Sequence, residues 1–480
     1  MNISVSQKEL LKSLTLGLVA LIALICWINF HPRQLSNTSE DQIGRKLLEG
    51  LDNLEKITQI QLIRIEPETG QKQELLIKKE GSEWILPSFS GFAAENSKKL
   101  TEILTPLFQL IILDIVRPPV STEDSKGIRN FHSECGVLSP GDEQFEYISP
   151  KDSSTVGSGA GLEVILEGEG HRILLDLLIG HRAPESSYSR DARFVRFPQE
   201  DYVYVVDFIG ESTQETATSS VIEYTDRVSF SPADYVDPDL LRISRWDILN
   251  MTMKDYTLAV QNVDDNVVYK DLVFHDVLVF KQTPDNPSSK IWSLQEQYTQ
   301  TSNGGWEQLA NADPSSANNT ILNETADIIG KLNFVDVSRK PLPLAQLFSS
   351  EKWGTELTTQ SSLLSDFGFC MLESDPVDPN RIEPILGGEG GSIELTTRSG
   401  IKIVLVFGRE QDNKRAVIAY ATYSREALSA TIDSEEEITF LESEAREKAA
   451  IKNARFSSWF YLIDEQDFQK IRFRVKDVLH

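Results

Sequence analysis

Apolar and polar residues alternate along much of the chain beyond a polar linker, and this pattern predicts β-strands. The alternating runs at 60–65 and 75–77 flank a turn at 67–70, as in a β-hairpin. At 94–111 the apolar residues instead recur every three or four positions, which predicts an amphipathic helix. An apolar strand at 113–116 follows this helix.

The same succession of elements occurs again further along the chain. Trp84 precedes the first helical stretch, and Asp114 lies in the strand that follows it. Trp306 and Asp336 hold the same places around a second helical stretch at 321–332. Both intervals span thirty residues. An equal spacing through a strand, a helix and a second strand predicts an internal repeat.

Other short signals recur in the same order in both halves. Each half has a residue followed by glycine, a Gly-rich turn, an alternating strand, a partner strand ending in glycine, and an aromatic strand ending in aspartate. In the first half these are Cys135-Gly136, 157–161, 162–166, Ile179-Gly180 and 202–207. In the second half they are Phe367-Gly368, 387–391, 393–395, Phe407-Gly408 and 459–464.

These patterns predict an α+β protein with two repeated units, residues 57–242 and 243–480. Each unit is expected to be an antiparallel sheet with one main packed helix, and a linker at 31–56 precedes the first unit. The second unit is expected to contain two insertions, around 262–304 and 410–450. The charged stretch at 433–448 is expected to form a solvated helix or loop.

The longest uncharged apolar stretch of the chain lies near its N-terminus. Residues 13–30 carry no charged side chain, and a helix of eighteen residues is about 27 Å long, enough to span a bilayer. Lys8 and Lys12 lie in a short tail at 1–12, and this bias predicts a cytoplasmic tail with the bulk of the chain extracytoplasmic, in the periplasm. A cleaved signal peptide is the alternative, but the run ends in Ile-Cys-Trp-Ile at 25–28, without the small residues that cleavage requires. We therefore expect an uncleaved transmembrane signal anchor.

Charge and cysteine content narrow the classes of function. The formal net charge is −26, which repels phosphate backbones and disfavours nucleic-acid binding. The three cysteines are Cys26, Cys135 and Cys370, and their spacing supports neither a disulfide framework nor a Cys-based zinc site. Cys135 and Cys370 could pair with each other, but we expect buried free thiols.

The tripeptide Asp366-Phe367-Gly368 is the one that holds magnesium in protein kinases. The sequence has no H-R-D-x-x-x-x-N motif upstream of it, and the glycines at 387–391 follow it instead of preceding it. Those glycines also fail as a dinucleotide fingerprint, because Ile393 stands in place of the third glycine. The sequence contains no P-loop motif. We therefore expect a structural turn at 366–368.

The six histidines and one polar loop offer the remaining candidate chemistry. His171 and His181 bracket a predicted strand that contains Asp176, so a metal site is an alternative there, with surface imidazoles as the expectation. A polar cluster that could contact a ligand follows this strand; it comprises Ser187, Ser189, Arg190, Asp191 and Arg193. None of these sets forms a recognisable catalytic motif, so we predict no catalytic, cofactor-binding or metal-binding residue, and no enzyme.

The order of the repeated signals resembles the family called domain of unknown function 4340. Its pattern is a hairpin leading to W-x-[IL], a helix, an F-G-[VL] turn, and a strand ending in [IVLF]-G. The matching residues are Trp84-Ile85-Leu86, Cys135-Gly136-Val137, Ile179-Gly180, Phe367-Gly368-Phe369 and Phe407-Gly408. The chain departs from the pattern where Cys135 replaces phenylalanine. The resemblance implies a membrane-anchored envelope protein, often encoded beside ABC-type transporters that resemble the gliding-motility export system.

These observations lead to one main hypothesis and two alternatives. The main hypothesis is a non-enzymatic, single-pass bacterial envelope protein that is an accessory or scaffold component of an ABC-type export or gliding-motility-like complex. Its ABC-type permease and ATPase are separate chains. The first alternative is an envelope polymer- or peptide-binding module unrelated to a transporter. The second is an envelope hydrolase, which requires a His or carboxylate constellation that only the fold could assemble.

Overall fold

The computed structural model describes residues 42–48, 54–66, 69–119, 125–141, 159–184, 187–188, 192–208, 224–263, 266–286, 289–300, 306–309, 314–349, 361–372, 385–432, 434–472 and 475–479. The expected tail at 1–12 and the expected membrane anchor at 13–30 lie outside these ranges. Within them, no helix combines the length and the apolar composition that a bilayer-spanning segment requires.

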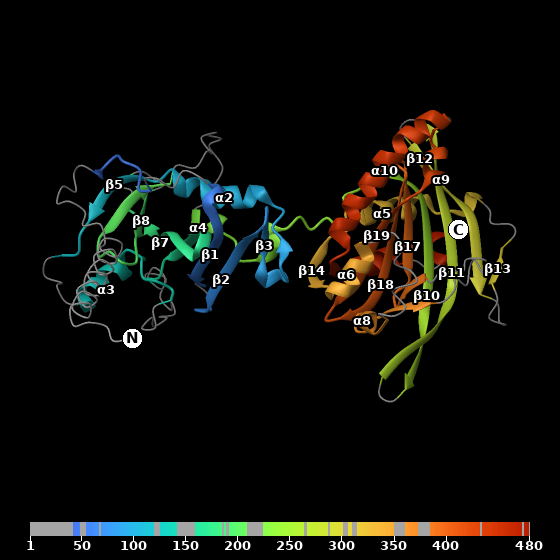
Figure 1. Ribbon diagram of the computed structural model, residues 1–480, viewed down its shortest axis with the longest axis horizontal. Coiled ribbons are helices and arrows are strands. Elements are labelled where there is room, and N and C mark those ends of the chain that lie inside the picture. Colours follow the sequence, from blue (N-terminus) through green and yellow to red (C-terminus); the bar gives the residue numbers. More distant parts are fainter. Residues whose placement is uncertain are drawn as a thin grey trace, which may run out of the picture. The chain divides into compact units, whose positions relative to one another are not determined.

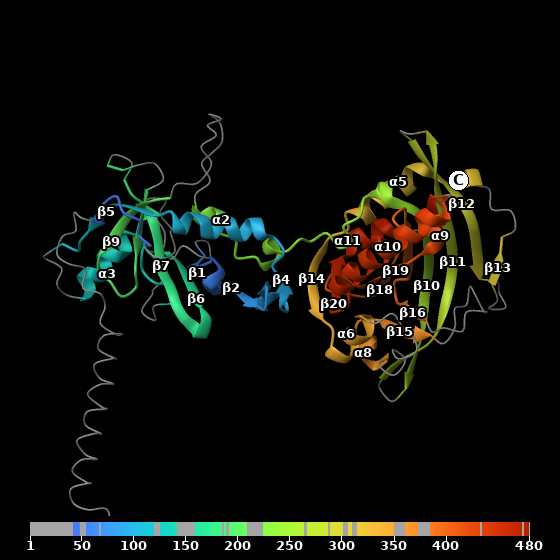
Figure 2. The same ribbon diagram turned by 45° about the horizontal axis from the view of Figure 1, so that its top comes forward.

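The chain folds as an α+β protein with two large antiparallel sheets and several helices (Figures 1 and 2). The first sheet has nine strands in the order β4-β3-β2-β1-β6-β7-β8-β9-β5. Its strands are β1 (Ile57–Ile65), β2 (Lys72–Glu80), β3 (Glu83–Leu86), β4 (Phe92–Ala93), β5 (Ile111–Val116), β6 (Leu162–Gly168), β7 (Arg172–Arg182), β8 (Ala192–Arg196) and β9 (Val203–Asp207).

The second sheet also has nine strands, in the order β13-β12-β11-β10-β17-β18-β19-β20-β14. Its strands are β10 (Ile248–Val263), β11 (Asn266–Asn286), β12 (Ser289–Gln300), β13 (Trp306–Gln308), β14 (Phe334–Arg339), β17 (Ser392–Thr397), β18 (Ile401–Gln411), β19 (Lys414–Tyr423) and β20 (Trp459–Asp464). A small separate sheet pairs β15 (Phe369–Leu372) with β16 (Ile385–Gly388).

More helices accompany the sheets than the one main helix per sheet that the sequence predicted. Those of the first half are α2 (Ser97–Phe108), α3 (Ser125–Glu134) and the short α4 (Tyr224–Arg227). Those of the second half are α5 (Asn319–Gly330), α6 (Leu342–Ser349), α8 (Ser361–Ser365), α9 (Arg425–Ser429), α10 (Glu435–Phe456), α11 (Glu465–Ile471) and α12 (Val475–Val478). The prediction of one helix per sheet was therefore too simple.

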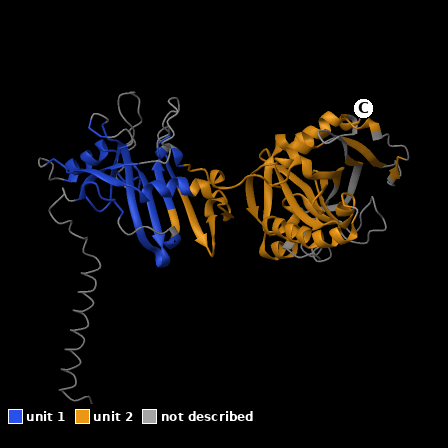
Figure 3. Cartoon of the chain, turned by 90° about the horizontal axis from the view of Figure 1, so that it is seen from above, with its two compact units in different colours: residues 1–57, 61–74, 101–228 blue, residues 58–60, 75–100, 229–480 orange. Residues whose placement is uncertain are grey.

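The chain divides into two compact units (Figure 3). The first comprises residues 1–57, 61–74 and 101–228, and the second comprises 58–60, 75–100 and 229–480. Strands β3 and β4, although they belong to the first sheet, therefore belong to the second unit.

The two nine-stranded sheets have the same strand order when β1 is matched with β10 and each later strand with its counterpart. Trp84 lies in β3 and Trp306 in β13. Because β3 takes the place of β12 in this order, the two tryptophans do not occupy equivalent strands. That part of the predicted alignment is wrong.

Asp114 and Asp336, at the other end of the same interval, do occupy equivalent positions. Strand β5 pairs with β9, and β14 pairs with β20, in each case with a β-bulge immediately before the aspartate. Each carboxylate accepts a hydrogen bond from the backbone N–H of the next residue, at 2.7 Å for Asp114 and 2.9 Å for Asp336. The aspartates thus hold the same irregularity at the same edge of each sheet.

The stretches expected to be insertions contribute strands to the second sheet. Residues 262–304 contain β11 and β12, and 410–450 contain β19. Residues 433–448 lie mostly in α10, a helix of 22 residues whose N-cap Ser434 accepts a hydrogen bond from the N–H of Glu437. Helix α10 contacts β18, β19 and β20 (Figure 2). It buries Ile438, Ala445, Ala449 and Phe456.

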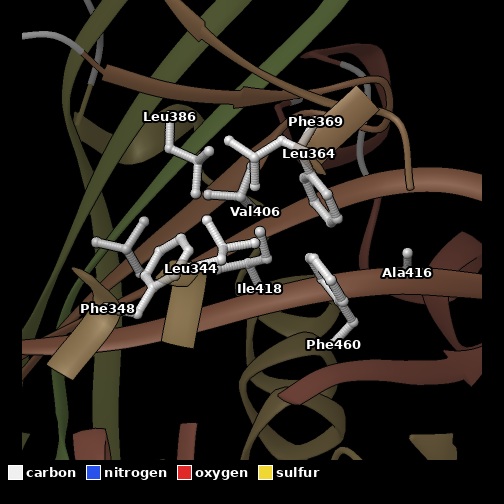
Figure 4. Close-up of a cluster of buried hydrophobic side chains, with 10 residues drawn as sticks. Leu344, Phe348, Leu364, Phe369, Leu386, Val406, Ala416, Ile418 and Phe460 are labelled. Carbon is white, nitrogen blue, oxygen red and sulfur yellow. The ribbon is translucent and has the colours of Figure 1, made fainter. Parts of the chain in front are cut away.

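A cluster of ten buried hydrophobic side chains lies around β18 and β19 in the second unit (Figure 4). It joins Val404 and Val406 of β18 to Ile418 of β19 and Phe460 of β20. Phe369 of β15 completes this side of the cluster, with 0% of its surface exposed. The short sheet of β15 and β16 is thereby packed onto the large one.

Candidate functional site

The tripeptide Asp366-Phe367-Gly368 forms a tight turn between α8 and β15. Gly368 has a φ of +76°, a left-handed conformation that favours glycine. The carbonyl of Phe367 accepts a hydrogen bond from the backbone N–H of Arg409 at 2.8 Å, and its ring stacks on Phe460 with centroids 4.1 Å apart. Asp366 is exposed. The tripeptide therefore anchors a turn to β18.

The first sheet has the same turn at Cys135-Gly136. Gly136 has a φ of +70°, and the carbonyl of Cys135 accepts a hydrogen bond from the backbone N–H of His181 at 3.0 Å. The sequence predicted that these strands end at Gly180 and Gly408, but β7 continues to Arg182 and β18 to Gln411. His181 directly follows Gly180, and Arg409 directly follows Gly408. The two turns therefore occupy corresponding places in the two sheets.

Each turn packs against a glycine of the neighbouring strand, Gly180 of β7 or Gly408 of β18. A Cβ atom on Gly408 would lie 2.2 Å from the carbonyl oxygen of Phe367, and one on Gly180 would lie 2.3 Å from that of Cys135. Nonbonded atoms do not approach so closely, so neither glycine accepts a side chain unless the backbone moves. We call each set a glycine turn: Cys135-Gly136 with Gly180, and Phe367-Gly368 with Gly408.

A buried arginine completes each glycine turn. Arg193 donates a hydrogen bond from Nη1 to the carbonyl of Gly180 at 3.2 Å, and Arg415 donates one to the carbonyl of Gly408 at 2.8 Å. Their side chains come from β8 and β19, and the whole residues are 5% and 9% exposed. Arg415 also forms a fork of two hydrogen bonds with Glu465, at 2.7 and 2.9 Å. These arginines donate hydrogen bonds to carbonyls within β7 and β18 and hold the turns in place.

The first glycine turn brings a cysteine and a histidine together, as a cysteine hydrolase would require. The His181 ring lies against Gly136, since a Cβ there would be 2.4 Å from the ring. Burial, with a smaller effect of the nearby Glu134, raises the pKa of the Cys135 thiol to about 11. Burial and then Arg193 lower the pKa of His181. At neutral pH both groups are therefore uncharged, and the geometry does not supply the thiolate that nucleophilic chemistry needs.

Two acidic side chains, Glu163 of β6 and Asp176 of β7, lie on the same face of the first sheet. Glu163 is directly opposite Leu178, and Asp176 is two residues from Leu178, so the two carboxyl groups are diagonal neighbours. Arg196 of β8 is also opposite Leu178 and continues the same row. We call Glu163 and Asp176 the carboxyl pair.

Burial raises the pKa of both members of the carboxyl pair. The pKa of Asp176 rises to about 6, because of burial first and the Glu163 charge second, while Arg196 opposes the shift. Glu163 is 7% exposed and accepts a hydrogen bond from Ser139 Oγ at 3.0 Å, which lowers its pKa in part. Asp176 Oδ1 is buried without a hydrogen-bond partner among the described residues. The pair is therefore poised to hold a proton below neutral pH.

The corresponding row of the second sheet has no such pair. Matching Gly180 with Gly408 places Ser392 where the first sheet has Glu163, Val404 where it has Asp176, and Ile418 where it has Arg196. Val404 and Ile418 belong to the hydrophobic cluster of Figure 4. The two sheets thus share a backbone arrangement, but the first has charged side chains in this row where the second has Ser, Val and Ile.

The metal alternative at His171 and His181 has no geometric support. His171 lies just before β7 and His181 lies near its end, so ten residues, or roughly 30 Å of extended chain, separate them. The side chain of His171 is 88% exposed and pairs only locally, with Glu167 at 3.1 Å. Among the described residues, no group of three or more His, Cys, Asp or Glu side chains could hold a metal ion.

The predicted polar cluster at 187–193 is divided by the structure. Ser187 is an exposed turn residue, while Arg193 is buried in β8 at the first glycine turn. Ser189, Arg190 and Asp191 lie outside the described residues.

Both cysteines of the folded part are free and buried, as predicted. Burial raises the pKa of the Cys370 thiol to about 12, with a smaller effect of Glu389. Cys26 lies outside the described residues. The two thiols are packing residues in their local environment.

A groove of about 550 Å³ lies within the second unit. The β2–β3 hairpin and the turn after it form one side, and the ends of β14, α10 and β20 form the other. Its apolar surface includes Ile85, Phe92, Ile451 and Trp459. Its volume falls in the range of small-molecule and peptide sites, about 300–1,000 Å³.

Three features of this arrangement were not found from the sequence. Arg415 was missed because its distance from Gly408 is seven residues, whereas Arg193 follows Gly180 by thirteen. The signal common to both halves is that the arginine lies in the next strand along the chain, β8 after Gly180 and β19 after Gly408. The carboxyl pair was missed because only the register of the β6–β7 hairpin brings Glu163 and Asp176 together. The groove was missed because its residues are far apart in sequence.

Searches with protein-family models, among curated proteins and among solved structures found no match to the chain. The resemblance to the family called domain of unknown function 4340 therefore stays a prediction that rests on the short motifs quoted above.

Proposed function

We propose that the chain is a non-enzymatic, single-pass protein of the bacterial envelope, a scaffold or accessory component of an ABC-type export or gliding-motility-like complex. Residues 13–30 serve as its transmembrane signal anchor, and the bulk of the chain is extracytoplasmic. The permease and the ATPase are separate chains. The two sheets are repeats of one unit, and they present surfaces to these partners.

The observation that carries this proposal is the pair of matching glycine turns. The motif that most resembles a catalytic element, Asp366-Phe367-Gly368, has a counterpart in Cys135-Gly136, and both make the same backbone contacts. A residue set that recurs at the same place in two sheets, with different side chains, is explained by a folding requirement. The duplicated architecture supports a scaffold, and the anchor supports its place at a membrane.

The proposal is tested by mild co-purification of the full chain from membranes after chemical cross-linking. We expect permease and ATPase subunits to be recovered with it, and we expect the variant Asp366→Ala to recover them equally, because Asp366 is an exposed turn residue. Recovery of the chain without any transporter subunit would contradict the proposal. A reporter that is active only in the periplasm, fused after His480, tests the topology, and cytoplasmic behaviour of that reporter would overturn it.

The groove favours a second candidate function, the binding of an envelope polymer or peptide without a transporter. It offers an apolar surface with charged groups at its rim, the usual composition of a ligand site. Co-sedimentation of the full chain with isolated envelope material is expected for this function. Equal recovery of the chain in the pellet with and without that material would exclude it.

A further inference from the structure

The floor of the groove is a set of packed aromatic rings. Phe92, in the short strand β4, lies 5.0 Å from Trp459 and 5.4 Å from Phe334 between ring centroids. Ile451 of α10 lines the groove with 64% of its surface exposed. Phe92 and Phe334 are themselves 2% and 4% exposed, so they support the floor from below. The apolar surface that a ligand would cover is formed by the partly exposed Ile85 and Trp459 and the exposed Ile451.

Most cationic side chains of the groove already have partners. Arg455 donates hydrogen bonds to the backbone carbonyls of the segment 237–240 and to Glu95. Arg242 pairs with Glu95 at 2.7 Å, and Lys452 donates to the carbonyl of Leu241 at 2.6 Å. These groups hold the wall together and have little capacity left for a ligand.

Arg339 differs from these cations. Its guanidinium lies over the ring of Trp459, 5.8 Å from the centroid. Among the described residues it forms no ion pair and donates no hydrogen bond. A guanidinium on an aromatic plate presents its fork of N–H donors in a fixed plane, which suits a carboxylate. The first sheet has the corresponding pair, Arg117 over Tyr202 at 5.6 Å.

Two carboxylates lie at the hairpin side of the groove. Glu80 and Glu83 are directly opposite each other across the β2–β3 ladder and both line the groove. Like charges in opposite positions destabilise a hairpin. No cation of the described residues forms an ion pair with either of them. A positive group on a ligand would relieve this repulsion.

We propose that the groove binds a short peptide that has a free C-terminal carboxylate and a positive charge near its other end. The carboxylate binds Arg339, the apolar side chains cover Ile85, Trp459 and Ile451, and the amino group or a basic side chain binds Glu80 and Glu83. This charge arrangement selects a zwitterionic peptide over an uncharged polymer. The inference deepens the second candidate function and rests on it.

The test is isothermal titration calorimetry of the full chain in detergent with the tetrapeptide Lys-Leu-Val-Leu. The free acid and its C-terminal amide are compared, each up to about 1 mM, where binding as weak as about 4 kcal/mol is detected. We expect the amide to bind at least about tenfold more weakly, because a charge-assisted hydrogen-bonded pair contributes about 1.5–3 kcal/mol. Equal binding of acid and amide, or no binding of either, overturns the proposal.

The variant Arg339→Gln should reduce binding of the free acid to the level of the amide and leave the amide unaffected. Arg117→Gln is the matched control, because it removes the corresponding arginine from the first sheet, and it should change neither affinity. Replacing both Glu80 and Glu83 by Gln should weaken binding of the free peptide. It should leave binding of the peptide acetylated at both amino groups unchanged. Undiminished binding of the free acid by Arg339→Gln in a protein with unchanged thermal unfolding contradicts the proposal.

Failure of this ligand class is distinguishable from failure of the function. If the tetrapeptide does not bind but the chain still co-sediments with envelope material, the peptide assignment is wrong and the binding function stands. If neither occurs while transporter subunits still co-purify, the scaffold function stands alone. The outcomes therefore separate the peptide assignment, the binding function and the scaffold function.

Discussion

Neutralising Asp176 should change how the stability of the first sheet depends on pH. The carboxyl group of Asp176 lies beside Glu163, with one oxygen buried and unpaired, whereas the second sheet has Val404 in the corresponding position. The charges of Glu163 and Arg196 act on it, the first raising and the second lowering its pKa, and a hydrogen bond with the Gln199 side chain also lowers it. We consider the variants Asp176→Asn and Asp176→Val.

The size of the effect follows from the pKa of Asp176, which rises from its ordinary value of 3.8 to about 6. A group with a raised pKa in the folded state binds more protons when folded, so its contribution to stability is complete below about pH 4 and is lost as the pH rises through 6. A shift of this size corresponds to about 3 kcal/mol. Because the carboxyl group is only partly buried, we expect about 2 kcal/mol.

Hydrogen–deuterium exchange of the β7 amides, measured at several pH values and corrected for intrinsic exchange rates, reports the local free energy of opening. In the native protein this free energy should fall by about 2 kcal/mol more between pH 4 and pH 7 than in Asp176→Asn or Asp176→Val. The reciprocal variant Val404→Asp should give the second sheet a new decrease over a similar range. Parallel pH profiles for the native protein and both Asp176 variants would refute the reasoning.

Two further predictions concern buried groups. Arg415→Met leaves Glu465 without its forked partner and should lower the free energy of unfolding of the second unit by about 3 kcal/mol, measured by urea denaturation. Lys448→Met removes an exposed pair with Glu444 on α10 and should cost less than about 0.5 kcal/mol, so equal losses in the two variants would contradict this account. Cys135 and Cys370 should resist iodoacetamide at pH 8 in the folded protein and react after unfolding, because burial and a raised pKa keep both thiols protonated. Mass spectrometry counts the labelled thiols, and rapid labelling of either cysteine in the native protein would contradict this prediction.

The sequence predicted the general architecture well because strand alternation and glycine spacing are local signals. The α+β class, the antiparallel sheets and the structural turn at Gly368 all follow from such signals. The edge aspartates were also matched correctly, since the same bulge fixes Asp114 and Asp336. Trp306 was mismatched because equal spacing does not reveal how strands order themselves in a sheet.

The parts that could not be predicted depend on contacts between distant residues. Helix α10 was expected to be solvated because its buried side is formed largely by alanines and by residues near its ends, which give a weak periodic pattern. The carboxyl pair depends on the register of β6 and β7, and a one-residue slip would place Glu163 on the other face. The groove needs side chains from 80 to 459 to converge, which no local pattern encodes.

The central claim is that the tripeptide at 366–368 serves a folding role shared by both sheets. Hydrogen–deuterium exchange of the full chain tests it directly with the variants Gly180→Ala, Gly408→Ala and Asp366→Ala. We predict that Gly180→Ala lowers protection in β6–β8 alone, Gly408→Ala lowers it in β17–β19 alone, and Asp366→Ala changes neither. Native protection in both glycine variants, or a loss of protection in Asp366→Ala, would contradict the claim.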